Sequence, residues 1–135
     1  MLEDERKDVD GAEKAYRAAI EADPGNAKAH NNLGWLLLSE RHDLNGADAE
    51  YSAALEIDPS YALAGAGRMY TRACMDEQNG QELAQVAEQY DGAAARWAGV
   101  LGSEHEAAVM ATAAAARVRT GIMSHGEACH NTTDS

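Results

Sequence analysis

The feature that most constrains this chain is an internal repeat with a period of about 35 residues. The segment Glu5–Ala12, read as ERKDVDGA, aligns without a gap on ERHDLNGA at residues 40–47, and the match continues to Pro24 and Pro59. Roughly half of the aligned positions from Leu2 to Pro24 are identical. A period in this range is typical of repeat arrays, in which each unit is a small group of elements that packs on its neighbours. The chain is therefore predicted to be such an array.

Each repeated unit has the pattern of a helix pair. Asp-Gly at 10–11 and Asn-Gly at 45–46 open a segment with Ala, an aromatic residue four positions later, and Ala three positions after that. This spacing places small and large apolar side chains on one helix face. Asp-Pro at 23–24 and 58–59 ends that helix, because the residue before proline is disfavoured in the α region. The apolar content is mostly Ala, the strongest helix former, so the chain is predicted to be all-α.

The second unit carries a set of small and apolar residues at characteristic spacing: Leu33, Gly34, Leu37, Ala47, Tyr51, Ala54 and Pro59. In these positions the chain resembles the tetratricopeptide repeat family. His30 stands where the family has its first aromatic residue, and the turn between the helices is one residue longer. The resemblance implies a right-handed α-solenoid of antiparallel helix pairs, here of two to three repeats with the first one incomplete.

The third unit matches less regularly. Leu63-x2-Ala66-Gly67-x2-Tyr70 fits the first-helix pattern when the linker after Pro59 is two residues shorter. This register keeps two arginines out of the core, where their burial would be costly. It predicts a buried stripe of Ala62, Leu63, Ala66, Met69, Tyr70 and Ala73. About ten inserted residues, around 76–87, are expected to lengthen the following helix backwards toward Gly80.

The two ends of the chain differ from the repeat. Met1-Leu2 aligns with the last turn of a first helix, so the helix that carries Tyr16 is expected to lack most of its partner and to belong to a longer array. Ser103-x-x-Glu106 has the form of a capping box and predicts a C-terminal capping helix over about residues 104–120. Residues 1–121 are thus predicted to form the repeat domain, and residues 122–135 a disordered tail.

The chain is strongly acidic, with a formal net charge of −12. This balance argues against binding to nucleic acid or to an anionic membrane, both of which require a basic surface. No apolar run reaches the length of a membrane span. Cys74 and Cys129 lie far apart and form no disulfide framework, which favours a reducing compartment. Together with an N-terminus unlike a signal peptide, this predicts a cytoplasmic protein.

The sequence shows no constellation of catalytic residues. It contains no nucleophile elbow, phosphate-binding loop or metalloprotease motif, so no enzyme activity and no cofactor are expected. In the tail, His125-x3-Cys129-His130 offers three metal ligands without a fourth, and no metal site is predicted there.

The family resemblance implies that the first helices of successive repeats line a concave groove that receives a peptide of a partner protein. Carried over to this chain, the groove residues are Lys28, Asn31, Asn32, Trp35, Ser39, Arg68 and Arg72. Arg68 and Arg72 lie one turn apart and suit a carboxylate. Trp35 either anchors the partner or packs on a neighbouring helix.

The predicted function is therefore a protein–protein interaction module. One alternative is a scaffold fragment that self-associates as a homo-oligomer through its uncovered N-terminal helix. Another is the recognition segment of a larger enzyme.

Overall fold

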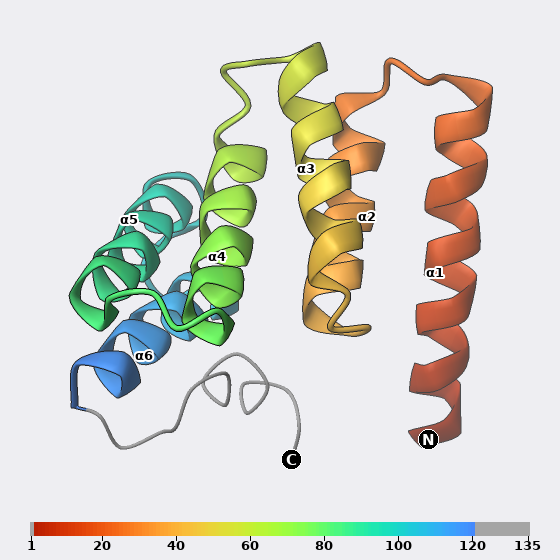
Figure 1. Ribbon diagram of the computed structural model, residues 1–135. Coiled ribbons are helices and arrows are strands. Elements are labelled where there is room, and N and C mark those ends of the chain that lie inside the picture. The colour runs from red at the N-terminus through yellow and green to blue at the C-terminus, as the bar shows by residue number, and fades with distance from the viewer. Residues whose placement is uncertain (1, 121–135) are drawn as a thin grey trace.

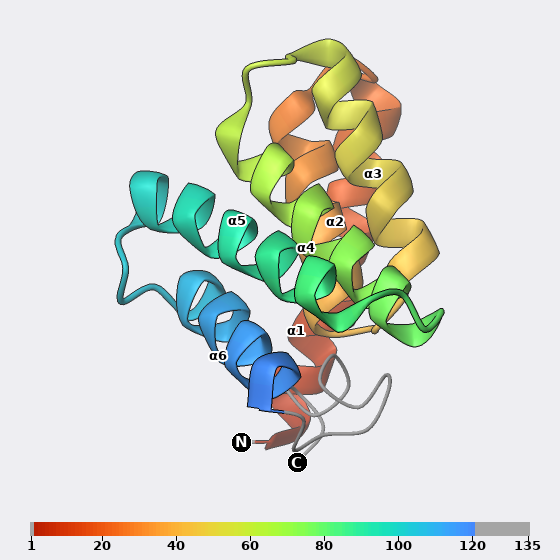
Figure 2. The ribbon, with the colours of Figure 1, turned by 60° about the vertical axis from the view of Figure 1, so that its left-hand side comes forward.

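The computed structural model describes residues 2–120, with side chains from residue 8 onward, and this part of the chain forms six α-helices (Figure 1). They are α1 (Leu2–Ala22), α2 (Ala27–Ser39), α3 (Leu44–Ile57), α4 (Ala62–Gln78), α5 (Leu83–Leu101) and α6 (Glu106–Thr120). Each helix packs on its neighbour in sequence, and α2 also contacts α4. α1 lies at one end of the array, and α5 and α6 lie side by side at the other (Figures 1 and 2). The predicted all-α array of helix pairs with a terminal helix is confirmed.

The helix boundaries follow the local signals in the sequence. Asn26 caps α2, because its Oδ1 accepts a hydrogen bond from the Ala29 N–H at 3.0 Å. Asp43 caps α3 in the same way through the Gly46 N–H at 2.9 Å. α1 and α3 both end just before Asp-Pro, as predicted, and Asp58 has an extended backbone with φ −138°.

The first unit differs from its prediction, because α1 runs unbroken from Leu2 to Ala22 and has no turn where the repeat predicts one. In the second unit the turn depends on His42, whose φ of 57° lies in the left-handed region. It is closed by a hydrogen bond of 2.8 Å from the Asp43 N–H to the Leu37 carbonyl. Lys7 stands in the place of His42, and lysine adopts this conformation less readily than histidine. The helix therefore continues through the position of the turn.

The inserted residues of the third unit lengthen both of its helices, whereas the sequence predicted a longer second helix only. α4 has 17 residues against 13 in α2, and α5 has 19 against 14 in α3. The turn between them contains Gly80, whose φ of 80° favours glycine.

The predicted buried stripe of α4 is correct in its centre and wrong at its start. Ala66, Tyr70 and Ala73 are buried, and Leu63 and Met69 are half-buried. Ala62 is exposed, because it stands in the first turn, where no neighbouring helix covers it.

The centre of the array is a contact of one tyrosine with two glycines. Tyr51 of α3 is only 1% exposed, and its ring lies against Gly34 of α2 and Gly67 of α4. A Cβ atom at Gly34 would lie 3.0 Å from Cε1 of the ring, and a Cβ atom at Gly67 would overlap the ring. The two glycines thus let α2 and α4 approach the same side chain closely.

A buried polar cluster joins α4 and α5. Glu77 is only 2% exposed, and the Tyr90 hydroxyl donates a hydrogen bond of 2.7 Å to its Oε1. The Tyr90 ring lies 5.1 Å from that of Tyr70, which in turn lies 5.6 Å from that of Trp97. The hydroxyl partner makes the burial of the Glu77 carboxyl tolerable.

Cys74 lies beside this cluster, with its Sγ 3.3 Å from the Tyr90 hydroxyl.

α1 is attached along one side only. None of its side chains from Asp8 onward is fully buried, although Tyr16 and Ile20 pack against the core. Arg41, from the turn after α2, donates a hydrogen bond of 3.1 Å to Glu13 and also pairs with Asp10. Because these ion pairs are exposed, they add little stability.

Replacing Gly67 by Ala should destabilise the fold by roughly 1–3 kcal/mol, because the new methyl group collides with the buried Tyr51 ring. Gly11→Ala is the matched control, since a Cβ atom there meets nothing within 4 Å in the middle of α1. It should stabilise the protein by up to about 1 kcal/mol. Urea unfolding measures both changes, and a Gly67→Ala protein as stable as the wild type would contradict the packing described.

Alkaline pH should weaken the fold through its buried tyrosines. Burial raises the pKa of both Tyr51 and Tyr90 above the ordinary value of 10.0. The folded state therefore holds these protons more tightly than the unfolded state. The resulting contribution to the free energy of unfolding is fully present below the unfolded pKa and is lost as the pH rises above about 10.

We expect the free energy of unfolding to fall as the pH rises above about 10. In Tyr51→Phe it should fall less steeply, and the two slopes should differ by about 1 kcal/mol per pH unit. Urea unfolding at about pH 8 and about pH 11 measures the slope. Equal slopes in the two proteins would show that Tyr51 does not contribute.

Candidate functional site

A small cleft lies on the side of α2 and α4 that faces α6. Its volume is about 180 Å³. We name it the tryptophan cleft; its lining residues are Asn31, Asn32, Trp35, Tyr51, Leu63, Trp97, Leu101, His105 and Ala107. The lining residues therefore come from five helices and an adjoining turn, and three of them belong to α2.

The three α2 residues share one face because they are spaced by three and four positions. Trp35 is half-buried, and its ring meets that of Trp97 edge to face, with centroids 5.8 Å apart and planes at 82°. Trp35 therefore packs on a neighbouring helix, one of the two roles that the sequence left open, and it still borders the cleft.

The two asparagine amides of the cleft make no hydrogen bond to the rest of residues 8–120. Asn31 is only 8% exposed, yet within residues 8–120 its side chain makes no hydrogen bond. The half-buried amide of Asn32 also has no bonding partner in this range. Neither amide is among the fully buried polar atoms that lack a partner, so both keep contact with solvent and can bond to a ligand. The cleft thus offers two donors and acceptors between aromatic walls.

Two further residues predicted for the groove lie outside this cleft. Lys28 is exposed and stands one turn before Asn32, near the N-terminal end of α2. Ser39 is buried, and its hydroxyl donates a hydrogen bond of 2.8 Å to the Trp35 carbonyl. Ser39 therefore satisfies its own hydroxyl within the helix and does not reach a ligand.

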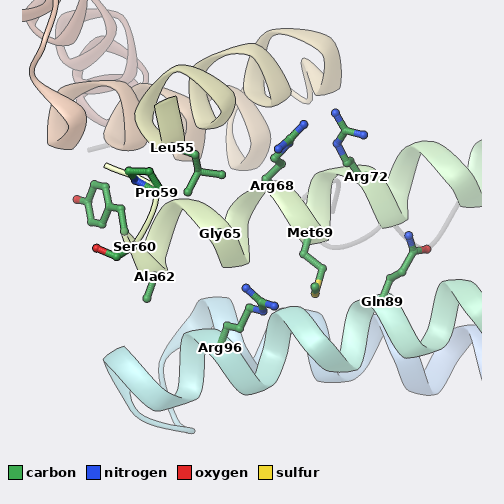
Figure 3. Close-up of a pocket in the computed structure, with 11 residues that line it drawn as sticks. Leu55, Pro59, Ser60, Ala62, Gly65, Arg68, Met69, Arg72, Gln89 and Arg96 are labelled. Atoms are coloured by element: carbon green, nitrogen blue, oxygen red, sulfur yellow. The ribbon is translucent and has the colours of Figure 1, made fainter. Parts of the chain in front are cut away.

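Arg68 and Arg72 lie in a different cleft, of about 680 Å³, between α3, α4 and α5 (Figure 3). We name it the arginine cleft; its lining residues are Leu55, Pro59, Ser60, Tyr61, Ala62, Gly65, Arg68, Met69, Arg72, Gln89 and Arg96. Arg72 follows Leu63 by nine positions, or about two and a half turns, so the two clefts lie on opposite sides of α4. The single groove expected from the sequence is thus divided in two.

Both predicted arginines already have a partner. The Nε atoms of Arg68 and Arg72 lie 3.6 and 3.1 Å from Oδ1 of Asp48 on α3. The Nη2 of Arg72 also donates to Oδ2 of this carboxylate at 3.4 Å. One acidic group therefore balances part of the charge of two guanidinium groups.

Arg96 is the member of this cleft that the sequence did not identify. It projects from α5 toward Gly65, where a Cβ atom would lie 3.4 Å from its Nη1 (Figure 3). Among residues 8–120 no carboxylate pairs with it and no hydrogen bond holds it. The only signal was that Arg96 precedes the buried Trp97 and so points away from the core of α5.

The described part of the chain holds no group of three metal-ligating side chains, and the predicted tail residues His125, Cys129 and His130 lie beyond it. No helix between residues 2 and 120 is long and apolar enough to cross a membrane. The two clefts therefore remain the candidate sites, and their side chains suit binding.

A family model described as tetratricopeptide repeat matches residues 15–49. The match begins inside α1, covers the whole of α2 and ends in α3. No curated protein matches the chain, and no solved structure matches it either. The match agrees with the resemblance found in the repeat, and the matched segment includes Asn31, Asn32 and Trp35.

Proposed function

We propose that this chain, which matches the tetratricopeptide repeat model over residues 15–49, is a non-enzymatic interaction module that binds a peptide of a partner protein at the tryptophan cleft. Repeats of this family generally mediate protein–protein interactions. The cleft lies on the matched repeat, on the helix that the family uses to line its groove.

The observation that carries this proposal is the unpaired amide of Asn31 in a nearly closed position. A side-chain amide offers two donors and one acceptor, which suit the N–H and carbonyl groups of a peptide backbone. Asn32, which is more exposed, adds a second side-chain amide with the same donors and acceptor in the same cleft. An extended peptide satisfies both amides where bulk water reaches Asn31 poorly.

The size of the cleft limits what enters it. Its volume of about 180 Å³ is below the range of about 300–1,000 Å³ that holds a whole small ligand. We therefore propose that one apolar side chain of the partner enters between Trp35 and Leu63. The rest of the peptide then runs along α2 toward Lys28, whose exposed ammonium group suits an acidic residue.

The two tryptophans of the chain provide a direct measurement, because both line this cleft. Peptides selected from a displayed random library should change the tryptophan emission on titration. The double variant Asn31→Ala with Asn32→Ala should weaken their binding about tenfold or more, as each lost hydrogen bond is worth about 1 kcal/mol.

Asn45→Ala, an exposed change of the same kind on α3, is the control and should leave affinity unchanged. Circular dichroism checks that each variant is folded. Selected peptides that bind equally to the double variant, with no change in emission, would remove the tryptophan cleft from the proposal.

Self-association is the second candidate, favoured by the one-sided attachment of α1. Ala15, Ala18 and Ala22 form an exposed stripe of small side chains on this helix. The net charge of −12 on each copy opposes such contact at low salt. Association through α1 should therefore strengthen as salt is raised, which light scattering measures. A constant monomer mass at low and high salt would exclude it.

The compartment and the wider protein stay predictions. The alternative that this chain is the recognition segment of a larger enzyme concerns residues beyond this sequence.

A further inference from the structure

A second hollow adjoins the arginine cleft along α4 and α5. This hollow has a volume of about 430 Å³, and its lining residues are Met69, Asp76, Gln81, Gln85, Glu88, Gln89 and Gly92. It shares Met69 and Gln89 with the arginine cleft. The two hollows are therefore neighbours along α4 and α5, and we name them together the α4–α5 groove.

The charges of this groove are separated along its length. Three guanidinium groups, those of Arg68, Arg72 and Arg96, lie at one end, and Asp48 offsets one of these positive charges. Asp76 and Glu88 lie at the other end, where Asp76 accepts a hydrogen bond of 3.1 Å from Gln89. The groove is therefore positive at one end and negative at the other.

The distance between the two ends follows from helix geometry. Arg68 and Asp76 are eight residues apart on α4, and Glu88 and Arg96 are eight residues apart on α5. At 1.5 Å per residue, each separation is about 12 Å along its helix. Because α4 and α5 are joined by a short turn and run antiparallel, Arg96 lies against Gly65 near the start of α4, whereas Arg68 and Arg72 point toward Asp48 of α3 (Figure 3). Asp76 and Glu88 line the same hollow near the turn between the two helices. An extended peptide rises about 3.3 Å per residue and covers this distance in about four residues.

The positive end is also the apolar end. Leu55, Pro59 and Tyr61 border the arginines there, and Tyr61 is half-buried. Gly65 adds no side chain, which leaves room for the Arg96 guanidinium group beside α4 (Figure 3). An apolar side chain of a ligand, placed beyond its carboxylate, can pack on these apolar residues.

We propose that the α4–α5 groove binds an extended peptide of a partner protein with a basic residue, an acidic residue about four positions away, and an apolar residue beyond the acidic one. The basic side chain of the peptide lies between Asp76 and Glu88. The carboxylate of the peptide bonds to Arg96, and no existing ion pair of Arg96 has to break first. Nucleic acids and membranes are disfavoured, because the acidic end and the net charge of −12 repel polyanions. This groove lies on the opposite side of α4 from the tryptophan cleft, so the proposal does not depend on that site.

The test is an NMR titration of the isotope-labelled full chain with the end-capped peptide Gly-Lys-Ser-Ala-Ser-Glu-Ser-Ala-Leu. The amide signals of Gly65 and Gly92 report on the two ends of the groove, and that of Gly11 on α1 is the internal control. We expect the first two to shift and the third to stay. Shifts confined to the tryptophan cleft, or no shifts, would overturn the proposal.

Matched variants test the charges. Arg96→Gln should weaken binding about fivefold to tenfold, because it removes a charge-assisted hydrogen bond. Arg17→Gln makes the same change in net charge on α1 and should leave binding unchanged. Arg96 is exposed and unpaired among residues 8–120, so its replacement should leave the fold intact. Equal affinity of Arg96→Gln and wild type would contradict the assignment.

Matched peptides test the polarity of the groove. Replacing the lysine of the probe by glutamate should weaken binding, and replacing its glutamate by lysine should weaken it more. An all-acidic peptide that binds as tightly as the probe would show that Asp76 and Glu88 play no part, which overturns the bipolar assignment. A dimer of the protein that dissociates in Arg96→Gln would assign the groove to a second copy and equally overturn it.

Discussion

The ring of Tyr51 fills the space that two glycines leave free, Gly34 on α2 and Gly67 on α4. This contact sets the spacing of the three central helices, because neither side of the ring has room to move in a close-packed interior. It also fixes the rotation of α4 about its own axis. Leu63 is thereby directed to the tryptophan cleft, and Arg68 to the arginine cleft. The two candidate surfaces are thus consequences of one buried aromatic contact.

The two candidate surfaces differ in charge, and so in the ligand that each one suits. The chain repels anions at long range, since its net charge is −12, yet three arginines gather at one end of the α4–α5 groove. Long-range repulsion and short-range hydrogen bonding together favour a ligand with a single carboxylate in a defined place over a polyanion. At the tryptophan cleft the side chains are neutral, and recognition there depends on the amides of Asn31 and Asn32 and on aromatic contact.

Part of the architecture was predictable from local signals, and part was not. The repeat predicted the helices around Tyr16 and Tyr51 and their ends at Asp-Pro, and the structure has both. The missing turn in α1 was not predicted, because it depends on whether one residue enters the left-handed region, as His42 does. The sequence predicted Arg68 as a site residue but not Arg96, because Arg96 comes to line the same cleft only when α5 packs on α4.

By itself the sequence determined the repeat, the all-α class and most helix boundaries. These depend on hydrogen bonds and steric limits among residues a few positions apart, such as the cap of α2 by Asn26. The tertiary structure alone decided that Trp35 meets Trp97 and that Arg72 faces away from it. The direction in which a helix face points depends on the rotation and packing of helices distant in sequence. A change of one residue in register rotates that face by about 100°, which local signals do not resolve.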